Sequence, residues 1–88
     1  MQITEHQQKL FLKHLAKSVV ERRQELGMSQ EKLAEMSGLT RNFISLIERA
    51  DTNPSILKLL AIASAMDCEL ESLLLATRSK AKARSGGR

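Results

Sequence analysis

Residues 30–49 read QEKLAEMSGLTRNFISLIER, and this stretch contains the strongest structural signal in the chain. Its apolar residues recur three or four positions apart on either side of Gly38, which is the period of two short α-helices. Glycine adopts a positive φ at little steric cost, so Gly38 suits a tight turn between them. Ser29 and Thr40 stand where the N-caps of the two helices are needed. The stretch therefore predicts a short helix, a glycine turn and a second short helix.

The residues on the inner sides of these two predicted helices indicate how the helices pack. Ala34 is small enough to let them approach closely. The side chains that can fill the seam are Leu33, Leu39, Ile44 and Ile47. Two short helices that cross steeply around a glycine turn form a helix-turn-helix, whose second helix lies in the major groove of DNA.

The remaining sequence predicts further helices around this pair. One covers 5–26 and ends at Gly27, which suits a left-handed C-cap. The segment 51–54 is a loop, because the residue before a proline avoids helical geometry. Two more helices follow over about 56–66 and about 69–76. We therefore expect an all-α bundle of four to five helices.

Length and composition agree with one small helical domain. The chain has 88 residues, of which 42% are hydrophobic, 27% charged and only two aromatic, a balance that argues against an all-β fold. We expect one domain over 1–76 with an extended N-terminal helix, followed by a flexible basic tail over 77–88. The sequence has no apolar run of about 20 residues and no secretory pattern. Together with the lone Cys68, this predicts a cytoplasmic location.

The net charge of +4 is unevenly distributed along the chain. Residues 1–76 contain nine Lys and Arg against ten Asp and Glu, so the predicted domain carries a charge of −1. An argument for nucleic-acid binding therefore depends on where particular residues lie and not on the isoelectric point. Two interpretations of the tail stay open: residues 80–84 follow the phosphate backbone of DNA, or the tail contacts nothing.

A charged residue interrupts the apolar stripe of the predicted first helix, which consists of Leu12, Ala16, Val19, Arg23 and Leu26. A guanidinium on the core side must either keep its head in water or meet an anion. Glu48 is the candidate anion, because it follows Ile44 by four residues on the apolar side of its own helix. An ion pair between Arg23 and Glu48 is favoured over an arginine at the edge of the core, since charges are rarely buried unpaired.

Over about 19–74, the chain resembles the phage repressor and Cro-type helix-turn-helix family. The resemblance rests on Arg23, Gly27-Met28-Ser29-Gln30, Leu33-Ala34, Gly38-Leu39, Ile44-Ser45, Ile47-Glu48-Arg49 and Pro54-Ser55. It implies a lambda repressor-like DNA-binding domain and an ion pair between Arg23 and Glu48. It also implies a transcription regulator, similar to the single-domain controller proteins of restriction–modification systems.

Two residues near the start of the second helix of the helix-turn-helix can read base edges by their own chemistry. Arg41 has a planar fork that can donate to O6 and N7 of guanine, and Asn42 can donate to and accept from adenine. For Asn42 the alternative is a solvated polar face. The resemblance adds Ser45 as a groove-facing residue. It also implies contacts to the DNA backbone for Gln30, Thr40, Arg49 and Asn53.

The sequence departs from the resemblance at Ala50, where many members of the family have glycine. Alanine in a left-handed C-cap is strained. We therefore expect a different loop after Arg49, which affects the backbone contacts implied for Arg49 and Asn53.

A single helix of this kind reads only a few base pairs, so proteins of this design bind DNA as dimers. The candidates for a dimer interface lie in the predicted last helix and are Leu70, Leu73, Leu74 and Leu75. A short helix buries about two leucines within its own domain, so four indicate a second buried surface. The alternative is that all four pack inward against the first helix.

These features predict a homodimeric regulator that binds double-stranded DNA at an operator with two-fold symmetry. Two alternatives remain: an antitoxin-type repressor with a toxin partner, and a helical interaction module that does not read DNA. We expect no enzymatic activity, no cofactor and no bound metal. His6 and His14 are eight residues apart without a cysteine or acid cluster, and no serine has a suitable His–acid pair.

Overall fold

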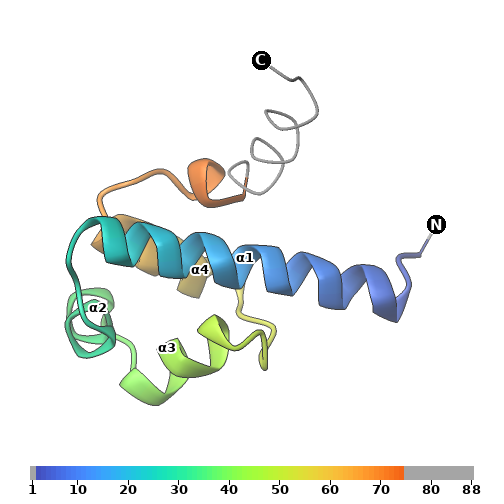
Figure 1. Ribbon diagram of the computed structural model, residues 1–88, viewed down its shortest axis with the longest axis horizontal. Coiled ribbons are helices and arrows are strands. Elements are labelled where there is room, and N and C mark those ends of the chain that lie inside the picture. The colour runs from blue at the N-terminus through green and yellow to red at the C-terminus, as the bar shows by residue number, and fades with distance from the viewer. Residues whose placement is uncertain (1, 75–88) are drawn as a thin grey trace.

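Helices make up most of residues 2–74, the part of the chain that the computed structural model describes (Figure 1). They are α1 (Glu5–Glu25), α2 (Gln30–Ser37), α3 (Arg41–Glu48) and α4 (Ile56–Ala65), and residues 70–74 are also helical. The described residues include no strand, and the predicted all-α fold is confirmed. The predicted tail over 77–88 and the end of the predicted last helix lie outside the described residues. None of the described helices is both long and apolar enough to cross a membrane.

Each of the four helices begins at a hydroxyl-bearing residue whose side-chain oxygen accepts from a backbone N–H in the first turn. The N-caps are Thr4, Ser29, Thr40 and Ser55, with oxygen-to-nitrogen distances of 3.0–3.2 Å. Such a cap satisfies one of the backbone donors that a helix start leaves without a partner. Because the caps are encoded locally, the bounds predicted from the sequence agree with the structure to within about one residue at each helix start.

The core lies where α1, α2, α3 and α4 meet, and its largest fully buried side chains are Val19, Leu33, Ile44, Ile62 and Met66. The predicted seam of the helix-turn-helix is part of it, since Ile47 is also buried and Leu39 packs against the cluster. Figure 1 shows α1 running the length of the molecule, with α3 beneath its second half. The first half of α1 extends beyond the bundle, and residues 2–11 are exposed there.

The apolar stripe of α1 ends earlier than predicted. Leu26 is 42% exposed, so its place in the predicted stripe is wrong. The reason is that Gly27 has a φ of 65° and turns the chain away from α1 directly after Leu26. Arg22 strengthens this end of the bundle, because its guanidinium donates to the backbone oxygens of Met66 (3.1 Å) and Asp67 (3.3 Å) after α4.

The loop after α3 keeps the left-handed geometry although it lacks a glycine. Ala50 has a φ of 60°, so the prediction of a different loop is wrong. The Ala50 N–H donates to Ile47 O (3.0 Å) and the Asp51 N–H donates to Leu46 O (2.8 Å). This pair of bonds is a Schellman motif, which satisfies the last carbonyls of α3. The hydrogen bonds and the packing around them hold alanine in a conformation that is unfavourable for it.

Replacing this alanine by glycine is expected to stabilise the protein. Ala50→Gly removes the steric conflict of Cβ in the left-handed region, and we expect the free energy of unfolding to rise by about 1 kcal/mol. Urea denaturation measures this change. The matched control is Ala61→Gly within α4, where glycine lowers stability by about 1 kcal/mol. Equal destabilisation by both substitutions would show that the loop does not strain Ala50.

Candidate nucleic-acid interface

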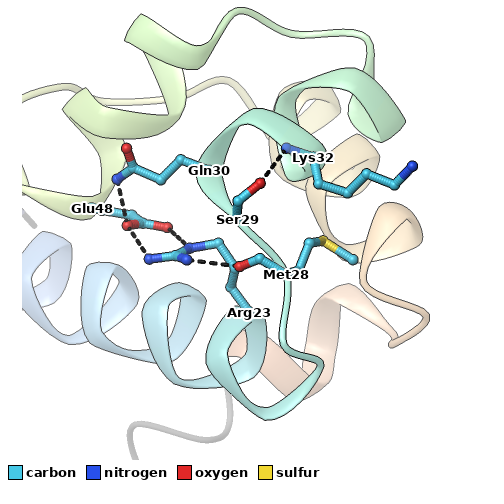
Figure 2. Close-up of polar contacts among 6 residues, drawn as sticks. All are labelled: Arg23, Met28, Ser29, Gln30, Lys32 and Glu48. Carbon is cyan, nitrogen blue, oxygen red and sulfur yellow. Dashed lines mark hydrogen bonds and ion pairs between the residues drawn. The ribbon is translucent and has the colours of Figure 1, made fainter.

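The helix-turn-helix is attached to α1 by the ion pair between Arg23 and Glu48 (Figure 2). The pair is bidentate, with 2.7 Å from Arg23 Nε to Glu48 Oε2 and 3.0 Å from Arg23 Nη2 to Glu48 Oε1. Arg23 Nη1 also donates to Met28 O at 2.8 Å. The side chains are only 14% and 6% exposed, respectively, so the predicted ion pair is confirmed. It joins the end of α1, the turn before α2 and the end of α3.

Gln30, the first residue of α2, completes this network. Its Nε2 donates to Glu48 Oε1 at 2.8 Å, and Figure 2 shows its side chain directed at the carboxylate. This contact was not predicted from the sequence, where the resemblance assigned Gln30 to the DNA backbone. An amide nitrogen has two hydrogens, so the bond to Glu48 leaves one donor for a phosphate. The network fixes the position of this donor relative to α3.

The start of α3 presents three polar side chains outside the core. The Thr40 hydroxyl oxygen accepts from the Phe43 N–H at 3.0 Å, which leaves the hydroxyl hydrogen to donate to a phosphate. Arg41 and Asn42, the first two residues of α3, are exposed. The backbone N–H groups at the start of a helix also favour a bound phosphate.

Glu31 on α2 holds the Arg41 side chain. Arg41 Nε lies 3.2 Å from Glu31 Oε2, and both side chains are more than 60% exposed. This contact leaves the two terminal nitrogens of the guanidinium, which are the donors of a fork that could reach a guanine. The pair was not predicted from the sequence. In the sequence, the only indication of this ion pair is that both residues lie in the first turn of their helices, on either side of the glycine turn.

The remaining candidates lie further along α3 and in the following loop. Ser45 is half-buried one turn after Arg41, and its backbone oxygen accepts from Arg49 Nε at 3.4 Å. Arg49 is exposed and its Nη1 lies 3.7 Å from Asp51 Oδ2. Asn53 is exposed in the loop before α4. The helical period places Asn42, Ser45 and Arg49 on the side of α3 that faces away from the buried Ile44 and Ile47. Arg41 lies at the border of this side, one turn before Ile44, so the candidates form one continuous surface.

The three described leucines of the predicted dimer interface differ in their burial. Leu73 is 3% exposed and belongs to the core of its own domain, so its assignment to a surface is wrong. Leu70 and Leu74 pack partly against the same core, and Leu75 lies outside the described residues. The predicted alternative of inward packing therefore applies to Leu73, because the helical segment 70–74 folds back over the core.

An exposed apolar surface lies on α4 instead, formed by Ile56, Leu57 and Leu60, which are 64%, 73% and 51% exposed, respectively. This surface was not predicted, although eight of the ten residues in the α4 sequence ILKLLAIASA are apolar. When a helix buries one apolar side and exposes another, the exposed side is a candidate surface for contact with another molecule.

The described residues offer little for other chemistry. No group of three or more His, Cys, Asp or Glu among them could hold a metal ion. Burial raises the pKa of the Cys68 thiol, although the Arg22 guanidinium opposes this shift. The thiol therefore stays protonated at neutral pH, which makes it a poor nucleophile.

Comparison with known proteins agrees with this geometry. The family model described as helix-turn-helix matches residues 19–73, from the buried part of α1 to the core leucine after α4. The chain belongs to the helix-turn-helix family. Its members include transcription regulators of the Cro and phage repressor type, as the sequence resemblance implied.

Three relatives illustrate the similarity. Control protein C.SmaI of Serratia marcescens is 38% identical over 60 residues, which are 68% of this chain and 71% of that protein. The crystal structure of the restriction-modification controller protein C.AhdI from Aeromonas hydrophila matches with a TM-score of 0.70 and 37% identity, covering 70% of this chain and 94% of that one. The DNA-binding domain of the P22 C2 repressor matches with a TM-score of 0.66 and 33% identity over 68% of this chain and 79% of that chain.

Proposed function

We propose that this helix-turn-helix protein is a sequence-specific transcription regulator that binds double-stranded DNA as a homodimer at an operator with two-fold symmetry. The observation that carries the proposal is the exposed Arg41 fork at the start of α3, on a helix anchored by the buried pair of Arg23 and Glu48. Arg41, Asn42 and Ser45 contact base edges in the major groove. The contacts to the DNA backbone come from Gln30, Thr40, Arg49 and Asn53.

The relatives support a regulator of the controller type. C.SmaI and C.AhdI are named as control and controller proteins, and the P22 C2 match is a DNA-binding domain. A protein of this kind acts by occupying a promoter: it represses where it blocks the polymerase and activates where it binds beside it. Because a homodimer forms by mass action, the concentration of the protein itself sets operator occupancy through dimerisation.

Selection from a random pool of double-stranded DNA at near-physiological salt tests the proposal. We expect enrichment of a motif with two-fold symmetry whose half-sites lie about 34–36 Å apart, centre to centre. Recovery of no motif, with binding that ignores sequence, would favour a helical interaction module. The net charge of −1 over 1–76 gives that alternative its support.

The surface on α4 supplies a test of the dimer. Leu57→Glu places a charge in the exposed apolar surface, and we expect it to shift the protein from dimer to monomer and to weaken operator binding. Because Leu57 is 73% exposed, the fold should tolerate the change. Sedimentation equilibrium measures the oligomeric state, and Leu10→Glu on the projecting half of α1 is the matched control. A dimer that survives Leu57→Glu but separates in Leu10→Glu would assign the interface to α1.

A further inference from the structure

The strip on α1 formed by Lys9, Lys13 and Lys17 has no role in the site described above. The three lysines are exposed and four residues apart, so they lie along one side of the helix. None of them forms an ion pair with another described residue. At about 1.5 Å per residue the strip is about 12 Å long. It begins in the half of α1 that extends beyond the bundle (Figure 1) and ends at Lys17, between the buried Ala16 and Ser18.

One end of this lysine strip adjoins the candidate DNA-binding surface. Lys13 and Lys17 line an open pocket together with Glu48, Arg49 and Ala50, the residues at the end of α3 and the turn after it. Arg49 is itself a candidate contact to the DNA backbone. The strip therefore continues the candidate interface from the end of α3 outward along α1.

The charge of the strip differs from that of the domain as a whole. The predicted domain carries −1, whereas Lys13, Lys17 and Arg49 are gathered around the pocket and Lys9 lies one turn further along α1. The acidic side chains that border the pocket are Glu21 and Glu48, and the carboxylate of Glu48 is occupied by Arg23 and Gln30. A concentration of positive charge next to a DNA-reading helix is suited to the phosphate backbone, which attracts lysine without regard to sequence.

We infer that Lys9, Lys13 and Lys17 bind the phosphate backbone of DNA next to the base pairs that α3 reads. This inference rests on the proposed function and extends it to a surface outside the helix-turn-helix. The lysine strip adds affinity without adding preference for any base, because phosphates are the same at every step. Each contact releases condensed cations, so each contributes about 0.9 to the slope of log affinity against log salt concentration.

The experiment measures operator affinity as a function of salt for the full chain and for Lys13→Gln/Lys17→Gln. We expect the slope of the variant to be smaller by about 0.9 for each phosphate that it no longer neutralises. The motif that the variant selects from a random pool should be unchanged. An unchanged slope, or a changed motif, would overturn the inference.

A charge-relocation control separates local contact from net charge. Adding Gln8→Lys to the double variant restores one positive charge at an exposed position on α1, about 140° around the helix from Lys13 at 3.6 residues per turn. If the lysines bind phosphates directly, the slope stays at the reduced value. Recovery of the slope would mean that only the total charge matters, which contradicts the inference.

The same titrations on a mixed-sequence duplex distinguish the two proposals. A wild-type protein that selects a motif but shows no lysine-dependent slope overturns the lysine strip alone. Lysine-dependent binding without any motif overturns sequence-specific regulation and leaves the lysine strip. A wild-type protein that binds no duplex overturns both.

Discussion

Glu48→Ala is expected to lower the free energy of unfolding by about 3–5 kcal/mol, because it leaves the Arg23 guanidinium without its anion. The two side chains are 14% and 6% exposed, so water cannot fully replace the missing carboxylate. The substitution also removes the acceptor of Gln30 Nε2. Urea denaturation monitored by circular dichroism measures the change. A free energy of unfolding equal to that of the wild type would contradict a buried pair.

Two controls separate the cost of an unpaired charge from the value of the pair. Glu35→Ala breaks an exposed contact with Lys32 at 3.7 Å. We expect the free energy of unfolding to change by no more than about 0.5 kcal/mol. Arg23→Met/Glu48→Leu replaces both charges by apolar side chains of similar size. Such replacements are often nearly neutral, so we expect the double variant to be more stable than Glu48→Ala. If the double variant loses as much stability as Glu48→Ala, the position and not the unpaired charge is responsible.

The Arg23–Glu48 contact could be found from the sequence because two periodic patterns intersect there. Arg23 falls on the apolar stripe of α1, and Glu48 falls beside the apolar side of α3. The helix starts could also be predicted from the sequence, since a hydroxyl N-cap depends on only three or four neighbouring residues. Local and periodic signals thus sufficed for the fold.

The features that the sequence did not indicate depend on how the helices are placed in space. Whether Leu73 points inward depends on how the segment after α4 returns over the core. The contact between Glu31 and Arg41 depends on the angle between α2 and α3. The backbone conformation of Ala50 likewise could not be predicted from its residue type. Alanine disfavours a positive φ, but the Schellman hydrogen bonds and the packing of α3 hold it in that conformation.

Arg41→Ala is expected to weaken binding to the selected operator by about 1–3 kcal/mol in each half-site and to relax the preference at one base position. In a dimer the substitution affects both half-sites, so the effect on the symmetric operator is about twice as large. The fold should be unaffected, because the Arg41 side chain is 61% exposed and its pair with Glu31 is a surface contact. Repeating the selection with the variant measures affinity and preference together.

Glu31→Gln decides whether Arg41 acts on DNA itself or only through its contact with Glu31. The substitution removes the carboxylate but leaves the Arg41 fork, so the base preference should persist. Affinity for all sequences should increase, because one negative charge beside the phosphates is removed. Arg41→Ala and Glu31→Gln are therefore expected to change affinity in opposite directions, and only the first should alter the motif. If both relax the same base position, Glu31 is needed to orient the fork; if neither does, Arg41 contributes to affinity through the phosphate backbone alone.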